Sequence, residues 1–309
     1  MIRLDDLALF VRSAALGSFS QAAREVNLLP GQASAAIQRL ERELDIRLFA
    51  RSTRSLRLTE EGKRYLPYAQ DALQALRDGY EGMRGESAAL SGMLQIAAPS
   101  DLGRNVLLPW ITEFRRNHPG LDIQLLVSDQ VADVFRDPVD IALRYGQIED
   151  ASFIALPLAP DNRRVLVASP SYLARRGRPG ALADLSGHDC LVYRLRGRTY
   201  DRWGFPTPEG EHTVQVSGSL VSDDADVVRR WAVAGEGIAY KSWLDVHEDV
   251  AAGRLEVLLP EVQGQATPLN LVCPHRKQFS PAVKLLHAML AERCLPLSAG
   301  LQRLREPAG

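Results

Sequence analysis

The sequence predicts an α/β protein in two parts, a small helical unit followed by a larger unit of two lobes. Three observations lead to this prediction. Apolar residues recur at helical spacing in residues 1–59, between residues that cap helices. Residues 60–83 carry apolar residues at alternating spacings of three and four. From residue 91 onward, short apolar strands alternate with helices, which is the pattern of an α/β sheet.

The overall composition is that of a globular chain, but it conceals a local charge bias. The 309 residues are 46% hydrophobic with a net charge of −1, which excludes a disordered chain, a collagen-like fibre and a protein that coats nucleic acid over its whole surface. Residues 1–59 nevertheless hold nine Arg, no Lys and six acidic residues, a net charge of +3. Four of these Arg lie in residues 46–59 without an acid. Such a run is either a solvated strand or a nucleic-acid contact.

The first two predicted helices are separated by Gly17. The predicted buried stripe of the first helix is Leu4, Leu7, Ala8, Val11 and Ala15. Ser18 is the expected cap of the second helix, with Gln21 completing a capping box, and this helix continues to about Val26. Its Ala22-Ala23 pair permits the close approach of another helix.

A third helix is predicted to start at Pro30, a residue suited to the first helical position. Its buried stripe is Ala33, Ile37, Leu40 and Leu44. Its opposite face holds Gly31, Gln32, Ala35, Gln38, Arg39 and Arg42. This face is small near its start and bears amide and guanidinium groups further along, so it can enter a major groove of DNA. The alternative is an ordinary solvent-exposed face.

A hairpin and a long helix follow the third helix. Two short strands, residues 47–49 and 56–58, enclose residues 52–55 in a wing that presents Arg51 and Arg54 to a nucleic-acid backbone or minor groove. Thr59 then caps a helix with an apolar heptad pattern. The pattern predicts pairing with a second copy, and the alternative is packing on its own domain. The predicted pairing residues are Leu66, Leu73, Leu76 and Tyr80.

The predicted boundaries are a first domain at residues 1–59, a linker helix at 60–90 and a second domain at 91–309. In the second domain, lobe 1 comprises about residues 91–161 and 268–295, and lobe 2 about residues 162–267. Predicted strands at 93–99, 122–128 and 140–146, with helices at 102–117, 131–137 and 281–294, build lobe 1. The alternation of strands and helices predicts parallel sheets.

Ligands of open α/β sheets bind beyond the carboxyl ends of the strands. The candidate ligand residues at those ends are Ser100, Asp101, Ser128, Asp129, Arg144 and Asp224. Tyr200 and Trp203, beside an Arg-rich loop, are candidates for a wall of the cleft. The free N–H groups at a helix start near Ser100, with the guanidinium of Arg144, favour a small organic anion. The alternatives are that Ser100 is a plain cap and that Tyr200 and Trp203 simply pack.

The motifs GSFSQAA (17–23) and SAAIQRLERELDIRLFARSTRSLRLTEEG (34–62), with APSDLGR (98–104) and DIALRYG (140–146), resemble those of LysR-type transcriptional regulators. The resemblance covers about residues 2–295. It implies a winged helix-turn-helix domain, a long linker helix and a two-lobed effector domain similar to periplasmic solute-binding proteins. The implied DNA contacts are Ser20 and Gln21 on phosphate, Pro30, Gly31, Ser34, Ala35 and Gln38 along base edges, and Arg51 and Arg54 on the backbone or minor groove.

Two residues depart from the family pattern. Leu29 stands where a Ser or Thr usually precedes the third helix, and Ala35 stands where an Arg is frequent. A missing cap hydroxyl costs about 1 kcal/mol, and a missing guanine contact costs about 1–3 kcal/mol of discrimination. The resemblance therefore implies DNA binding but leaves the operator sequence open.

The expected protein is a cytoplasmic homodimer or homotetramer that binds double-stranded DNA at an interrupted inverted repeat, binds a small-molecule effector and acts on RNA polymerase. The acidic start and the lack of a long apolar run predict neither a leader nor a membrane span. No cofactor, metal or catalytic residue is expected, because the six His are scattered and nucleophile and phosphate-loop motifs are missing. The rival classes are an enzyme and a free solute-binding protein. Cys190, Cys273 and Cys294 leave open a thiol-redox-responsive regulator of the same fold.

Overall fold

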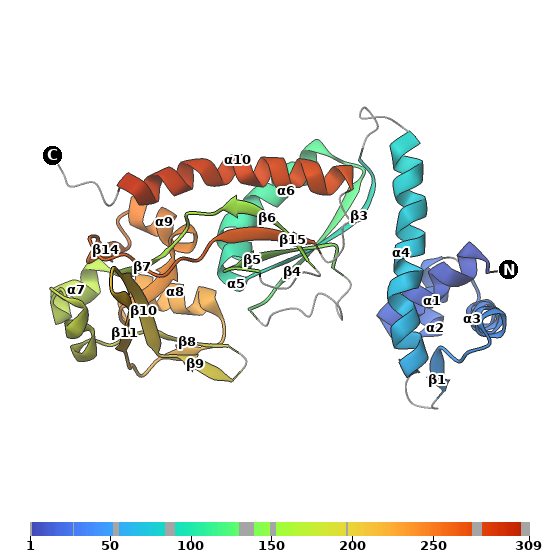
Figure 1. The fold of residues 1–309 in the computed structure, drawn as a ribbon, viewed down its shortest axis with the longest axis horizontal. Coiled ribbons are helices and arrows are strands. Elements are labelled where there is room, and N and C mark those ends of the chain that lie inside the picture. The colour runs from blue at the N-terminus through green and yellow to red at the C-terminus, as the bar shows by residue number, and fades with distance from the viewer. Residues whose placement is uncertain are drawn as a thin grey trace. The chain divides into compact units, whose positions relative to one another are not determined.

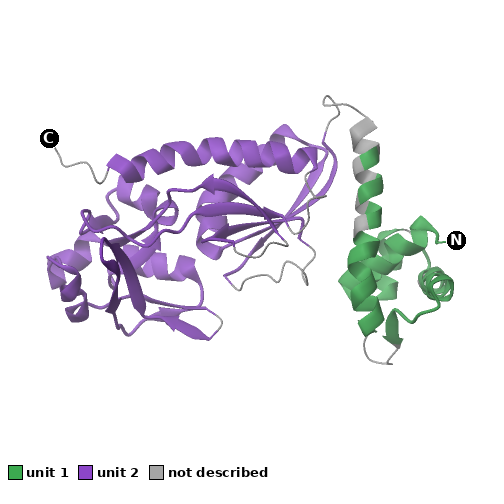
Figure 2. Cartoon of the chain, in the orientation of Figure 1, with its two compact units in different colours: residues 1–88 green, residues 89–309 purple. Residues whose placement is uncertain are grey.

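The structure is a computed structural model that describes residues 2–26, 28–51, 56–83, 90–129, 139–148, 153–195, 197–273 and 280–303. The chain divides into two compact units, residues 1–88 and 89–309 (Figure 2). The helix predicted as a separate linker belongs to the first unit by its contacts. The first unit contains α1 (Leu4–Leu16), α2 (Phe19–Glu25), α3 (Pro30–Leu44), β1 (Phe49–Arg51), β2 (Leu56–Leu58) and α4 (Glu60–Met83) (Figure 1).

The predicted caps form at the end of α1 and at the start of α2. Gly17 ends α1 in the left-handed conformation, at a φ of 60° that glycine adopts without strain. The Ser18 side chain accepts a hydrogen bond from the Gln21 N–H, at 3.3 Å, and so starts α2. The predicted wing also forms, as an antiparallel pair in which Phe49 lies opposite Leu58. Its first strand starts two residues later than predicted.

The buried face of α1 differs from the predicted stripe. The buried residues are Asp6, Leu7, Leu9, Phe10 and Ser13, whereas Leu4 is 52% exposed and Ala8 and Ala15 are exposed. Apolar residues occur almost all round this helix, so periodicity alone did not select a face. The choice depends on the neighbours: Phe10 packs edge-on against Phe49 of β1, with ring centroids 5.6 Å apart, and α1 contacts both α3 and α4.

Lobe 1 of the second unit is one mixed five-stranded sheet with helices. Its elements are β3 (Gly92–Ala98), α5 (Ser100–Leu102), the π-helix η1 (Gly103–Leu107), α6 (Leu108–Asn117), β4 (Leu121–Val127), β5 (Ile141–Tyr145), β6 (Ile154–Ala159), β15 (Leu269–Cys273) and α10 (Pro281–Arg303). The strand order is β4-β3-β5-β15-β6. Strand β3 is parallel to β4 and β5, but β15 is antiparallel to both of its neighbours. The predicted parallel pairing holds for β3, β4 and β5 but is wrong for β15, which returns from lobe 2 in the opposite direction.

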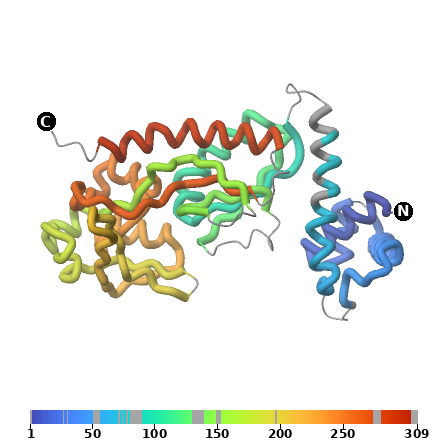
Figure 3. The backbone as a smooth tube through the Cα atoms, in the orientation of Figure 1, coloured from blue at the N-terminus to red at the C-terminus, as the bar shows by residue number. Residues whose placement is uncertain are grey.

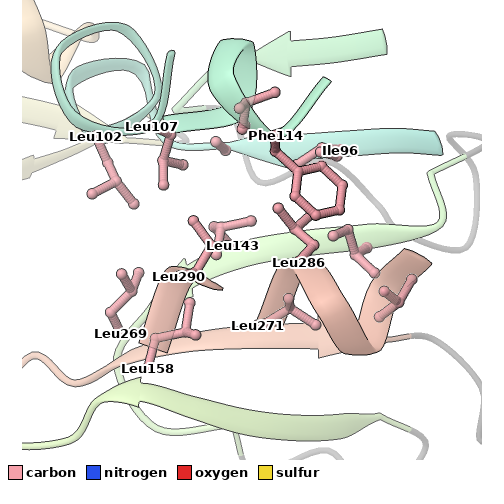
Figure 4. Packing of buried hydrophobic residues seen from close by; sticks show 14 of the residues in the cluster. Ile96, Leu102, Leu107, Phe114, Leu143, Leu158, Leu269, Leu271, Leu286 and Leu290 are labelled. Atoms are coloured by element: carbon pink, nitrogen blue, oxygen red, sulfur yellow. The ribbon is translucent and has the colours of Figure 1, made fainter. Parts of the chain in front are cut away.

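The core of lobe 1 lies between the sheet and two helices. Ile96, Leu143 and Leu271 extend from three strands toward Phe114 of α6 and Leu286 of α10 (Figure 4). All five are at most 5% exposed. Residues 130–138, where a short helix was predicted, lie outside the described residues.

Lobe 2 has smaller sheets. Its elements are β7 (Arg164–Ala168), α7 (Pro170–Arg176), the 3₁₀-helix η2 (Leu182–Gly187), β8 (Val192–Leu195), β9 (Arg198–Tyr200), β10 (Arg202–Thr207), β11 (Gly210–Gln215), β12 (Val221–Ser222), α8 (Ala225–Ala234), β13 (Ala239–Ser242), α9 (Trp243–Ala251) and β14 (Glu256–Leu258). Strand β12 is parallel to β8, while β7 lies antiparallel to both β13 and β14. The β10–β11 and β8–β9 hairpins are antiparallel as well, so parallel sheets were a wrong expectation for most of this lobe.

Helix α10 is longer than predicted and joins the two lobes. It runs to Arg303 instead of ending at Cys294, along one side of the second unit (Figure 3). Its last turns belong to lobe 2, because the Trp243 indole N–H donates to the Leu297 carbonyl at 2.8 Å and Leu301 lies in a lobe 2 core cluster. Among the described residues, no helix is both long enough and apolar enough to cross a membrane.

Candidate functional site

One face of α3 is exposed as the sequence predicted. Gly31, Gln32, Ala35 and Gln38 are exposed and Ser34 is partly exposed, whereas Ala33, Ile37 and Leu40 are at most 1% exposed. The exposed face carries the small residues Gly31, Ser34 and Ala35 beside Gln32 near its start, and it bears Gln38 and Arg42 further along. A surface of this shape fits a DNA groove.

Two of the predicted DNA contacts on α3 have partners inside the first unit. The Gln32 side-chain oxygen accepts a hydrogen bond from the Leu29 N–H at 2.8 Å, which supplies one cap interaction at a helix start that lacks a hydroxyl. Both Arg39 Nε and Nη2 donate to the carboxylate of Asp6, at 3.0 and 2.7 Å. Since Asp6 is 3% exposed, Arg39 joins α3 to α1.

A buried acid that no sequence pattern indicated holds the start of the wing. Glu41 is 5% exposed and accepts hydrogen bonds from the Leu48 and Phe49 N–H groups, at 2.8 and 3.2 Å. Arg47 adds an ion pair at 3.2 Å. At the other side of the wing, Thr59 Oγ1 accepts from the Gly62 N–H at 2.9 Å, which confirms it as the cap of α4. The side chain of Arg51 and all of Arg54 lie outside the described residues.

The remaining predicted contacts of the first unit lie on α2 and α4. Gln21 is exposed and Ser20 is partly exposed. On α4, Leu66 and Leu73 pack against the core of their own unit, whereas Leu76 is 50% exposed. The first half of the heptad pattern thus has the own-domain packing that was the alternative to pairing. The side chain of Tyr80 lies outside the described residues.

In the second unit, two helix starts from different lobes converge on the carboxylate of Asp129. The Ser100 N–H donates to Oδ1 at 2.8 Å, and the Ala225 N–H donates to Oδ2 at 2.6 Å. The Ser100 hydroxyl also donates to Oδ2. Ser100 belongs to lobe 1, is 1% exposed and lies at the carboxyl end of β3, while Ala225 begins α8 of lobe 2. These three donors are called the carboxylate cradle below.

Further side chains tie the same two helices together beside the cradle. The Arg104 guanidinium donates to both oxygens of Asp224, at 3.0 and 2.8 Å, and the Asn105 amide donates to Asp226 at 2.8 Å. Arg104 and Asn105 lie in the π-helix η1, a local widening that often marks functional sites. The sequence predicted an ordinary helix here, because a single inserted residue leaves no clear periodic signal.

Asp101 is the centre of a buried ion cluster between the lobes. It is 1% exposed, with Arg229 Nε 2.9 Å from Oδ1 and Lys241 Nζ 2.5 Å from Oδ2. The Lys241 ammonium also donates a hydrogen bond to the Ala225 carbonyl at 3.0 Å. Burial raises the pKa of Asp101 to about 7, although the two cations oppose this change. The predicted site residue Asp101 therefore joins the lobes.

The cluster extends on both sides of these ions. Arg229 also contacts Asp249 at 2.5 Å and Asp226 at 3.2 Å. On the other side, Lys241 lies 3.4 Å from Asp245, which accepts a hydrogen bond from the Tyr145 hydroxyl at 2.7 Å. Burial raises the pKa of Tyr145 well above its usual value. Besides Asp101, which was a predicted site residue, the sequence signal for this cluster was a charged residue, Lys241, inside the apolar strand GIAYK.

The other predicted ligand residues do not all meet at the cradle. Trp203 is 5% exposed and packs on Tyr240 in the lobe 2 core, with ring centroids 5.4 Å apart. Trp203 is therefore a core residue, which was the alternative to a role in ligand binding. Tyr200 is 47% exposed beside Tyr193. The Arg144 guanidinium lies 5.9 Å from the centre of the Phe153 ring. Ser128 is exposed at the end of β4.

The three thiols are poor candidates for redox chemistry. Cys190, Cys273 and Cys294 are at most 1% exposed. Burial raises the pKa of Cys190 and of Cys273 to about 12, and that of Cys294 to about 11. Thiolates are the reactive form, so these environments favour inert core packing over the redox alternative.

Comparisons with known proteins cover both units. A model of the bacterial regulatory helix-turn-helix protein, lysR family, matches residues 4–63, and a model of the LysR substrate binding domain matches residues 87–295. The HTH-type transcriptional regulator DmlR of Escherichia coli strain K12 is 35% identical over 258 residues, which is 84% of each chain. The HTH-type transcriptional activator TtdR of the same strain is 32% identical over 280 residues, 91% of this chain and 89% of the relative.

Solved structures agree with these matches. CrgA, a LysR-type transcriptional regulator from Neisseria meningitidis, is 28% identical with a TM-score of 0.57 over 97% of this chain and 98% of that one. A full-length variant of OxyR from Pseudomonas aeruginosa has a TM-score of 0.70 at 17% identity over 94% of this chain and 95% of that one, a likeness of fold alone. The chain therefore belongs to the LysR family of transcriptional regulators, with a DNA-binding helix-turn-helix domain followed by a two-lobed effector-binding domain.

Proposed function

We propose that this regulator senses a small organic carboxylate in the carboxylate cradle and changes promoter binding in response. The observation that carries the proposal is the convergence of two backbone N–H groups and one buried hydroxyl on a single carboxylate, from both lobes at once. Helix starts attract anions because their N–H groups lack intrahelical partners. A ligand held by Ser100 and Ala225 would contact both lobes and so favour one arrangement of them.

The effector acts through differential affinity for the arrangements of the two lobes, since only such a difference can shift their equilibrium. Its binding is expected to alter the spacing or angle of paired winged domains, and with it the recruitment of RNA polymerase. The active species is a cytoplasmic homodimer or homotetramer that binds an interrupted inverted repeat. Gly31, Ser34, Ala35 and Gln38 are the proposed residues along base edges.

DNA binding is tested first, by a gel shift of the full chain on the DNA upstream of its own gene. Specific binding is expected at low salt. The change Gln38→Ala should weaken it at least tenfold, because an exposed amide on the groove-facing side is lost, whereas Gln124→Ala, exposed in the second unit, should leave it unchanged. Arg54→Ala should weaken binding to all sequences and lower the salt slope by about one. Absence of any retarded band at low salt would refute the proposal.

Effector binding is tested by a thermal-shift screen of small carboxylates on the full chain. A carboxylate that binds the native state raises Tm with its concentration. Ser100→Ala should abolish the shift of every hit, because it removes the cradle hydroxyl, while Ser186→Ala, an exposed serine of lobe 2, should preserve it. Hits that survive Ser100→Ala would place the effector elsewhere.

A further inference from the structure

The carboxylate cradle already holds a carboxylate, and it comes from the chain itself. Asp129 directly follows Ser128 at the end of β4, on lobe 1, yet one of its oxygens accepts the Ala225 N–H of lobe 2 at 2.6 Å. Its other oxygen accepts the Ser100 N–H at 2.8 Å. Both oxygens are therefore engaged by the groups that a small carboxylate would use.

Helix α8 has no need of Asp129 as a cap. Asp224 already occupies the cap position and accepts from the N–H groups of Asp226 and Val227, at 2.9 and 3.3 Å. The Ala225 N–H instead finds its acceptors on lobe 1, where the Asp129 carboxylate lies at 2.6 Å and the Ser100 hydroxyl oxygen at 3.1 Å. Asp129 is thus a second carboxylate at one helix start, supplied from the opposite lobe.

Nor do the lobes depend on Asp129 alone for their contact. Arg104 pairs with Asp224, Asn105 with Asp226, and Arg229 with Asp101, each across the same two helices. Replacing the Asp129 carboxylate by another would leave these ties in place. Asp129 is also only partly buried, so exchange with a dissolved anion requires no unfolding.

We infer that Asp129 is a built-in competitor of the effector, which occupies the carboxylate position and holds the lobes together until an effector displaces it. The inference rests on the proposed function of the cradle and adds its regulation. An attached side chain competes at an effective concentration on the order of millimolar. A simple monocarboxylate makes only the contacts that Asp129 already makes, so it does not displace Asp129. An effector must make further contacts beyond those of its carboxylate. Asp129 therefore sets both the effector concentration that is needed for a response and the kinds of carboxylate that can bind.

The test is the binding of acetate to the full chain carrying Asp129→Ala. Acetate is titrated at constant ionic strength against sodium chloride, and Tm is followed. Half-maximal stabilisation is expected at an acetate concentration at least tenfold lower than for the wild type, because the vacated cradle accepts the free carboxylate. The matched control is Asp122→Ala, an exposed acid on β4, the strand that Asp129 follows, which should behave as the wild type.

The second variant, Asp129→Asn, keeps the size of the side chain and covers the case in which the alanine variant does not fold. Its amide oxygen still accepts from the cradle, but its NH₂ group faces another donor, so the asparagine competes with acetate less well than aspartate does. A gain in acetate affinity smaller than that of Asp129→Ala is therefore expected. The inference is overturned if neither variant binds acetate more tightly than the wild type, or if Asp122→Ala gains as much.

The two proposals fail separately. A wild-type carboxylate hit that is lost in Ser100→Ala, together with no acetate gain in either Asp129 variant, leaves the effector site standing and overturns the role of Asp129. An acetate gain in a chain that binds no DNA supports the role of Asp129 and overturns the proposed regulation of a promoter.

Discussion

Glu41 and Arg229 each contact several partners from a buried or nearly buried position. Glu41 accepts from two wing N–H groups and pairs with Arg47. Arg229 contacts the carboxylates of Asp101, Asp226 and Asp249 while its own side chain is 13% exposed. Buried polar groups are costly only when their partners are removed, so these two positions should respond far more strongly than exposed neighbours of the same type.

Glu41→Ala should destabilise the wing by about 1–3 kcal/mol for each N–H group that is left without an acceptor. Hydrogen exchange of residues 47–51 would speed up accordingly. The control is Glu60→Ala, because the ion pair of Glu60 with Lys63 is exposed. It should change the free energy of opening measured by hydrogen exchange by less than about 0.5 kcal/mol. Equal protection in the two variants would show that Glu41 does not hold the wing.

Arg229→Met should lower the free energy of unfolding of the second unit by about 3–5 kcal/mol, since it removes the cation that three buried carboxylates share. Arg230→Met is the matched control, because Arg230 is adjacent, pairs with Asp226 and is 65% exposed, and should cost about 0–1 kcal/mol. Urea unfolding followed by tryptophan fluorescence measures the difference, since all four Trp lie in residues 89–309. A cost for Arg229→Met as small as that of the control would contradict the buried cluster.

At the scale of elements, α4 has different roles along its length. Its first half buries Ala69 and packs Leu66 and Leu73 on the core of its own unit. Further on, Leu76 is 50% exposed although it continues the same pattern. An apolar residue in register with a buried stripe but open to solvent is typical of a coiled-coil partner site, and the proposed self-association is assigned to this second half.

Leu76→Asp should therefore weaken self-association at least tenfold, because a charge would be buried in the pairing seam. Tyr68→Asp lies on the same helix, outside the heptad pattern and 70% exposed, and should have little effect. Sedimentation velocity over a concentration series measures both. A Leu76→Asp protein that associates like the wild type would assign the pairing to another surface.

At the scale of the whole molecule, the second unit is held by charges between lobes as well as by an apolar core within each. Asp101 of lobe 1 meets Arg229 and Lys241 of lobe 2 in a place where all three are buried or nearly so. Helix α10 adds a rigid connection that packs on both lobes. Any rearrangement of the lobes thus has to break ion pairs between them, and the strength of these pairs depends on the protonation of Asp101.

The pH dependence of stability follows from Asp101. Its native pKa of about 7 lies above the unfolded value of about 3.9, so the native state keeps a proton that the unfolded state releases. This contribution is complete below about pH 4 and is lost as the pH rises through 7, at about 1.4 kcal/mol for each pKa unit. Asp224 and Asp226, whose pKa values are lowered, lose their contribution only in acid.

Tm is accordingly expected to fall between about pH 4 and about pH 7, and Asp101→Asn should flatten this dependence. The measurement is Tm against pH in buffers of equal ionic strength, for the wild type and the variant. Parallel curves would mean that another group titrates in this range.

The sequence by itself determined the local structure of this protein. Caps and turn residues act within a few positions along the chain, which is why Gly17, Ser18, Pro30 and Thr59 placed the helix boundaries correctly. The face of α3 followed from a clear apolar period. Strands β3, β4 and β5 of lobe 1 followed from the alternation, whereas β6 and the π-helix η1 were not predicted. The family motifs linked the two parts of the chain to a known class of regulator.

Only the tertiary structure decided contacts between residues far apart in the chain. The buried face of α1, the antiparallel course of β15 and the extension of α10 into lobe 2 each depend on which element lies opposite. The candidate site shows the same limit: the sequence singled out Ser100, Asp129 and Asp224, but not that Asp129 would meet the start of α8, nearly a hundred residues away. Periodicity reports what a segment buries, whereas a hydrogen bond between lobes is set by how the lobes pack.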